Sequence, residues 1–167
     1  MGRRERGFSF AELMLTMLIL ASMTAMTAAG IPVVMRLYQR AVDTANAETY
    51  LNTTLMALRG RLCVSKPVLD NVGNVLYCEH PQSGYYYFSN SAEGIQVVEY
   101  LDIDRLNPLE QPLTPGEPGE FISSYDDTKK IRYDDTGFFT IEGLQVEKQG
   151  TILAKLDTPY VIHTLNP

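Results

Sequence analysis

The sequence has few of the residues that nucleic-acid interfaces depend on. Three arginines and one glutamate give residues 1–7 a formal charge of +2, which leaves −8 for the remainder of a 167-residue chain whose total is −6. No basic stripe follows residue 7. We therefore expect no direct nucleic-acid binding by the acidic body.

Histidine and cysteine are also scarce, with two of each. Neither His80 nor His163 has a serine or cysteine nucleophile signature near it, and no glycine-rich phosphate-binding loop is present. The two cysteines with His80 do not form a zinc-ligand spacing. We expect neither an enzyme nor a cofactor. Aspartates could chelate calcium, although Asp between short strands is more typical of hairpin turns; they are Asp102, Asp104, Asp126, Asp127, Asp134 and Asp135.

Charge is absent between Glu12 and Arg36, which leaves 23 uncharged positions at 13–35. This length is sufficient to cross about 30 Å of hydrocarbon as a helix. The arginines precede this segment and the acidic body follows it, so the N-terminus is expected in the cytoplasm and the body outside. A buried helix of a soluble protein is the alternative, but such a helix normally contains polar interruptions.

A secretory signal peptide is a second interpretation of the N-terminus. The arginines would form its basic region, and the small residues at 27–29 would form its cleavage site. Glu12 argues against it, because it lies where such peptides carry apolar residues. The apolar stretch also continues beyond Ala29 to Met35.

An amphipathic pattern follows the apolar segment without a break. Neither Gly nor Pro occurs from Val33 to Arg59, so one helix is expected from about Phe8 to Leu62, with a membrane part at 8–35 and an amphipathic part at 36–62. A kink or local melting is expected at Gly30 and Pro32. The predicted apolar stripe recurs at mostly three- and four-residue steps, at Val34, Leu37, Ala41, Ala45, Leu51, Leu55, Leu58 and Leu62.

Residues 63–167 are expected to form a β-sheet domain. Segments rich in β-branched and aromatic residues alternate with short turns, which indicates an antiparallel meander. Four prolines make 107–119 an expected exposed loop. The fold class is therefore α+β, with the amphipathic part of the helix packed on an antiparallel sheet. In the run at Tyr85–Phe88, Tyr85 and Tyr87 share one face; they could bind sugars or partner subunits, or fill a half-buried strand.

The stretch GFSFAEL at 7–13, followed by an apolar segment, resembles the processing site of type IV prepilins and pseudopilins. The resemblance covers about the first 30 residues and implies a leader at 1–7, cleavage after Gly7 by a prepilin peptidase, and methylation of Phe8. Glu12 matches the glutamate at the fifth mature position. The resemblance also implies a pilin-like fold and assembly into a filament through the N-terminal helix.

The position of Glu12 fits this resemblance physically. Phe8 and Glu12 are four residues apart and share a helix face. A lone carboxylate in an apolar environment costs several kcal/mol. Cleavage would give Phe8 a free amine that is protonated near neutral pH. In pilins, the resemblance implies, the amine that pairs with the glutamate belongs to a neighbouring subunit.

Several roles within this family fit the sequence. The chain could be a major pilin, a minor pilin, or a pseudopilin of a secretion or DNA-uptake (competence) machine, and its acidic, loop-rich body favours the last two. Its partners would be other pilin subunits, the peptidase and the cytoplasmic membrane, and its final location a cell-surface or periplasm-spanning filament. The alternative is a signal-anchored or secreted extracellular binding domain that does not polymerise.

The two cysteines leave a further choice open. Cys63 and Cys78 are 15 residues apart, and outside the membrane they could form a disulfide that adds about 3 kcal/mol of stability. Two free thiols are the alternative.

Overall fold

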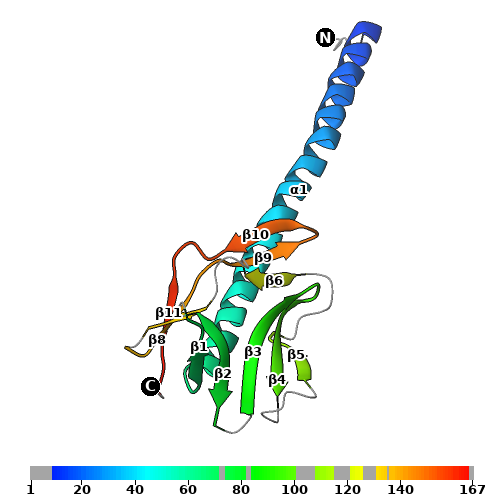
Figure 1. Cartoon of the computed structure of the whole chain (residues 1–167). Coiled ribbons are helices and arrows are strands. Elements are labelled where there is room, and N and C mark those ends of the chain that lie inside the picture. The colour runs from blue at the N-terminus through cyan, green and yellow to red at the C-terminus, as the bar shows by residue number, and fades with distance from the viewer. Residues whose placement is uncertain are drawn as a thin grey trace, which may run out of the picture. The chain divides into compact units, whose positions relative to one another are not determined.

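The computed structural model describes residues 9–71, 74–81, 84–100, 108–114, 121–125, 131–134 and 136–165. Its first element is α1, a 53-residue helix from Phe10 to Leu62, as the uninterrupted sequence predicts (Figure 1). Pro32 lies inside α1 and the helix continues through it, so the local melting expected at Gly30 and Pro32 is absent. A proline removes one backbone donor, and the hydrogen bonds before and after it keep the helix intact. A kink at this point stays a prediction.

The chain divides into two compact units, 1–42 and 43–167. In the second unit one stripe of α1 is buried, with the three- and four-residue spacing of a single helix face. The predicted stripe is correct from Leu51 onward, but Ala45 is exposed and Ala47 is buried instead. Ala47 is four residues before Leu51, whereas Ala45 is six residues before it and falls on another face. The buried residues are Ala47, Leu51, Thr54, Leu55, Leu58 and Leu62.

A five-stranded antiparallel sheet forms one part of the second unit (Figure 1). Its strands pair in sequence order, which confirms the predicted meander for this region. They are β1 (Lys66–Leu69), β2 (Val75–His80), β3 (Gly84–Ser91), β4 (Gly94–Tyr100) and β5 (Pro108–Pro112).

Strand β5 corrects the prediction of a loop at 107–119. Residues 108–112 pair with β4 at the edge of the sheet, while 107 and 115–119 lie outside the described residues. An edge strand tolerates proline, because one side of its backbone needs no hydrogen-bond donor. Pro108 and Pro112 are the first and last residues of β5. Two of the four prolines of this segment therefore lie in a strand at the edge of the sheet.

The remaining strands form two three-stranded sheets in which β9 lies between β10 and β6, and β8 lies between β11 and β7. The predicted meander is wrong here, because β6 pairs with β9 and β8 pairs with β11. Gly143, with a φ of 72°, separates β8 from β9 and lets the chain leave one sheet for the other. The strands are β6 (Ile122–Tyr125), β7 (Arg132–Tyr133), β8 (Phe138–Ile141), β9 (Leu144–Lys148), β10 (Thr151–Lys155) and β11 (Tyr160–His163).

The apolar stripe of 43–62 and the inner faces of the strands form one core. Leu58 and Leu62 are fully buried there together with Tyr86, Phe139 and Leu144. The fold class predicted from the sequence, a long helix packed on antiparallel sheet, is confirmed.

The end of α1 is held by the C-terminal segment of the chain. The backbone N–H of Leu165 donates to the Cys63 carbonyl at 2.7 Å, and the Thr164 hydroxyl donates to the carbonyls of Cys63 and Ser65 at 3.3 Å each. The Ser65 hydroxyl donates to the Arg61 carbonyl at 2.8 Å. Carbonyls at a helix end have no partner within the helix, so these bonds satisfy groups whose burial would otherwise be costly.

Candidate functional site

The first candidate site is the apolar surface of α1 in the first unit. Every residue from 9 to 42 is exposed, including Phe10 at 76% and Leu18 at 69% of their full accessible area. By length and composition α1 can cross a membrane, and none of the residues in its most apolar 18-residue stretch is buried inside the protein. An apolar surface of this extent marks a lipid or protein contact, because water solvates it poorly.

Four hydroxyl side chains within this segment are satisfied inside the helix. Four hydroxyls donate to backbone carbonyls three or four residues earlier, at 2.8 to 3.1 Å. A hydroxyl bonded in this way carries little penalty in a hydrocarbon environment. The segment can therefore lie in lipid despite these polar residues, which are Thr16, Ser22, Thr24 and Thr27.

A shallow apolar groove surrounds Gly30 on the same helix. It is lined by one side of α1, and a Cβ atom added to Gly30 would meet no atom within 4 Å. Because glycine has no Cβ atom, the helix backbone at Gly30 is accessible to a neighbouring surface. The lining residues are Thr27, Gly30, Ile31, Val34, Met35 and Tyr38.

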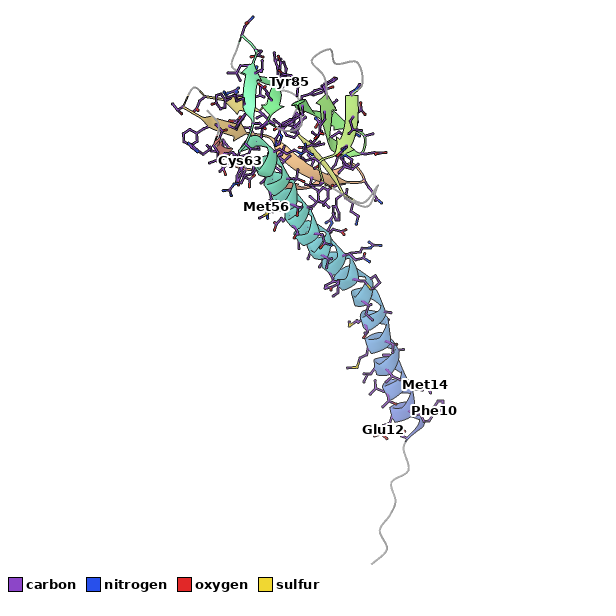
Figure 2. The ribbon with its side chains drawn as sticks, turned by 90° about the horizontal axis from the view of Figure 1, so that it is seen from below. Phe10, Glu12, Met14, Met56, Cys63 and Tyr85 are labelled. Atoms are coloured by element: carbon purple, nitrogen blue, oxygen red, sulfur yellow. The ribbon has the colours of Figure 1, made fainter. Side chains whose placement is uncertain are left out.

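Glu12 lies in the first turn of α1, next to Phe10 and Met14 (Figure 2). The backbone N–H of Ser9 donates to Glu12 Oε2 at 3.1 Å, and the Ser9 carbonyl accepts the N–H of Leu13 at 3.2 Å. Ser9 therefore occupies the N-cap position, and Glu12 accepts its backbone N–H as the glutamate of a capping box does. A carboxylate here also favours the positive end of the helix dipole.

This local role of Glu12 was not predicted from the sequence. The spacing Ser-x-x-Glu before an apolar run is a signature of a helix start, and it is present at 9–12. Gly7 and Phe8 lie outside the described residues, so the predicted proximity of Phe8 to Glu12 stays a prediction.

Both cysteines are free thiols in the structure, and the disulfide that the sequence allows is not formed. The Cys63 sulfur contacts the Gly60 carbonyl at 3.6 Å. Cys78 is buried in the core, and burial raises the pKa of its thiol to about 12, against a smaller opposite effect of its hydrogen bond with Tyr86. A thiol with so high a pKa is almost entirely protonated at neutral pH and is a poor nucleophile.

The polar residues considered as ligands or catalysts have structural contacts where they are described. Asp134 Oδ1 accepts the backbone N–H groups of Thr136 at 3.2 Å and Phe138 at 2.8 Å, and these bonds lower the pKa of the carboxyl. Asp134 is therefore a turn residue. His163 packs its ring on Phe138 at 4.9 Å between centroids. The other predicted calcium ligands lie outside the described residues, namely Asp102, Asp104, Asp126, Asp127 and Asp135.

Tyr85 and Tyr87 share one face of β3, and the intervening Tyr86 is buried on the other face, as the alternation predicts. Tyr86 shares a 2.8 Å hydrogen bond with Ser65. Burial raises the pKa of Tyr86 far above its ordinary value. The middle tyrosine is thus a core residue and its two neighbours belong to a surface.

Comparison of the chain with known protein families, with curated proteins and with solved structures finds no match in any of the three.

Proposed function

We propose that this chain is a type IV pilin-like structural subunit, either a minor pilin or a pseudopilin. In this proposal it is inserted in the cytoplasmic membrane, cleaved after Gly7, methylated on Phe8 and assembled into a filament through the first half of α1. The second unit would lie outside the cytoplasmic membrane. The partners are then other pilin subunits and the prepilin peptidase.

The observation that carries the proposal is a carboxylate at the start of an exposed apolar segment of α1, 13–35, that holds no other charge. Such a helix needs an apolar cover, which a bilayer supplies before assembly and neighbouring helices supply afterwards. When this part of α1 moves from the bilayer into the core of a filament, it exchanges one apolar environment for another. The segment can therefore be stored in the membrane and later used as an interface.

Glu12 retains capacity for a further partner. An ionised carboxylate has about four acceptor sites, and among the described residues it accepts one hydrogen bond, from Ser9. A protonated amine on a neighbouring subunit would supply both a donor and the opposite charge, which lowers the cost of the carboxylate in an apolar environment. The capping contact and the proposed intersubunit contact are compatible, because cleavage after Gly7 leaves the Ser9 amide in place.

The first experiment is mass spectrometry of the N-terminus of the protein isolated from its host membrane. A chain that begins at a methylated Phe8 is the expected result. An intact Met1, or a start at Gly30 after signal-peptide cleavage, would refute the proposal and favour the non-polymerising extracellular domain.

A second experiment separates the charge of Glu12 from its capping role. Glutamine at this position keeps the side-chain acceptor of a capping box and removes the charge, whereas alanine removes both. If the charge pairs with a neighbouring amine, Glu12→Gln and Glu12→Ala should both reduce incorporation into sheared filaments about tenfold or more, as expected for loss of a charged partner in an apolar interface. If only the cap matters, Glu12→Gln will assemble normally.

Ser9→Ala is the matched control for this series. It keeps the backbone N–H that Glu12 accepts and changes neither the charge nor the cleavage residues. Membrane levels of each variant, measured before shearing, show whether a loss of incorporation reflects assembly or insertion.

A further inference from the structure

Four tyrosines from three adjacent strands line one hollow on the five-stranded sheet. Alternation along the strands places them on the face opposite Cys78 and Tyr86, which are buried in the core. The hollow has a volume of about 450 Å³, a size typical of small-molecule sites. Figure 2 marks Tyr85, one of its residues. The lining consists of Leu76 and the tyrosine cluster, defined as Tyr77, Tyr85, Tyr87 and Tyr100.

The hollow arises because β2 and β3 separate. Their pairing runs from His80 opposite Gly84 to Cys78 opposite Tyr86. The next pair in this register would be Tyr77 and Tyr87, but the pairing ends before it. The start of β2 pairs elsewhere instead, with the Val75 N–H donating to the Ile131 carbonyl at 2.9 Å. Space therefore opens between two tyrosines that a continuous ladder would bring together.

The rings are fixed in two pairs on either side of this space. Tyr77 and Tyr85 meet edge to face, with centroids 5.6 Å apart and planes at 82°. Tyr87 and Tyr100 are stacked, with centroids 6.0 Å apart and planes at 22°. The edge-to-face contact covers one face of one ring, and the stacked contact covers one face of each ring, so each pair leaves negative π-faces that its own contact does not cover.

The charge near the cluster is negative. Exposed Glu110 of β5 pairs with Val98 of β4, which in turn pairs with Tyr87, so Glu110 lies on the same face of the sheet as the cluster. Burial, the interaction with Tyr100 and the Glu110 charge raise the pKa of the Tyr87 hydroxyl. Glu79 lies opposite Tyr85, although Lys66 lies opposite Glu79 in turn. Aromatic faces beside a carboxylate attract a cation and disfavour phosphate or carboxylate ligands.

We propose that the tyrosine cluster binds a quaternary ammonium ion of the size of choline. A trimethylammonium group presents a positive, apolar surface that needs no hydrogen-bond acceptors, so it suits a hollow lined by rings and one leucine better than a hydrated primary amine does. The site lies on strands of the second unit, so the proposal is independent of filament assembly.

The test is isothermal titration calorimetry of the full chain in phosphatidylglycerol nanodiscs, which contain no quaternary ammonium lipid. Choline is expected to bind saturably, and its uncharged isostere 3,3-dimethylbutan-1-ol should bind at least about tenfold more weakly. Equal binding of the isostere, binding of glucose without choline, or no binding of choline would overturn the proposal. Empty nanodiscs give the background heat.

Variants then locate the site. Tyr87→Leu and Tyr77→Leu each remove one ring and should weaken choline binding about tenfold, and Glu110→Gln should weaken it about threefold. Tyr38→Leu, at an exposed tyrosine of the first unit, and Glu93→Gln, at the exposed β3–β4 turn, are the matched controls and should leave the affinity unchanged.

Circular dichroism of each variant reports whether the sheet is retained. If Tyr87→Leu does not fold, Tyr87→Phe keeps the ring and should bind choline within about twofold of the native chain. Unchanged affinity in folded Tyr77→Leu and Tyr87→Leu would overturn the proposal even if choline binds elsewhere on the protein.

Discussion

The two parts of α1 have the same backbone conformation and opposite surroundings. Leu18 in the first unit is 69% exposed, whereas Leu58 in the second is 2% exposed. The first part is apolar on all faces, so no single face is matched to a core. The second part has polar residues between its apolar positions, so one stripe packs on the sheets and the rest faces water. The difference shows that helix formation and helix burial are separate properties of this sequence.

Leu→Ala substitutions in the two parts of α1 should differ most in their effect on the free energy of unfolding. Leu58→Ala should lower the free energy of unfolding of the second unit by about 2–5 kcal/mol, because it leaves a cavity in the core. Leu18→Ala should leave that stability within about 0.5 kcal/mol. Urea unfolding in detergent, followed by tyrosine fluorescence, measures both. Similar losses from the two substitutions would contradict the division into a buried and an exposed part.

A second prediction uses the buried thiol as a pH probe. The folded pKa of Cys78 is about 12, above its ordinary value of 9.0, so its stabilising contribution is complete below pH 9 and is lost as the pH rises toward 12. Linkage predicts a total loss of about 1.4 kcal/mol between pH 8 and pH 10, with the slope approaching about 1.4 kcal/mol per pH unit only above pH 10. Unfolding midpoints measured between pH 8 and about 10 test this, because tyrosine titration adds to the effect only at higher pH.

Cys78→Ala is the control for the pH dependence and should flatten the slope. Reaction with N-ethylmaleimide followed by mass spectrometry provides a second measurement. Native protein should be modified at the half-buried Cys63 and protected at Cys78. Failure of both thiols to react even after unfolding would show a disulfide and contradict the structure.

The third prediction removes one hydroxyl from each environment. Tyr86→Phe deletes the bond to the Ser65 hydroxyl inside the core and should lower the free energy of unfolding by about 1 kcal/mol. Tyr38→Phe removes a hydroxyl from a side chain that is 68% exposed and should have no measurable effect. Thermal unfolding of the two variants in the same detergent gives the comparison, and an equal change in both would argue against a buried Tyr86–Ser65 contact.

The smallest effect concerns the two glycines of α1. A Cβ added at Gly30 or Gly60 meets no atom within 4 Å, so alanine at either position should stabilise the helix of the isolated chain by about 0.5–1 kcal/mol. In a filament the outcomes should diverge. Gly30→Ala narrows a groove in the proposed interface and should reduce incorporation, whereas Gly60→Ala should not. Equal incorporation would remove the Gly30 groove from the assembly proposal.

The sequence predicted the long helix and most strands because their signals are local. The run from Val33 to Arg59 contains no helix breaker, and the alternation along β3 placed Tyr85 and Tyr87 correctly on one face. The failures involve longer-range relations. The edge position of β5 depends on its pairing with β4, and the pairing of β6 with β9 joins segments about twenty residues apart. No local pattern contains that information.

The candidate sites divide in the same way. Glu12 stood out from the sequence because charge is rare in an apolar span, and its capping contact with Ser9 was also readable from their spacing. The tyrosine cluster was only partly visible: Tyr85 and Tyr87 could be assigned to one face, but Tyr77 and Tyr100 join them through strand pairing. The end of the pairing between β2 and β3 also depends on a distant segment, because Val75 of β2 hydrogen-bonds to Ile131, which lies outside the five-stranded sheet.

Residue spacing alone predicted that this protein has one long helix, apolar in its first part and striped in its second, followed by strands. These properties follow from residue spacing, from the absence of charge at 13–35 and from the absence of glycine and proline at 33–59, which act within a few residues of the chain. Three further features could be seen only in the tertiary structure. They are the pairing of the strands, the hollow lined by Tyr77 and Tyr87, and the free thiols of Cys63 and Cys78. Those outcomes depend on contacts between distant segments, whose free energies are set by packing in the assembled core.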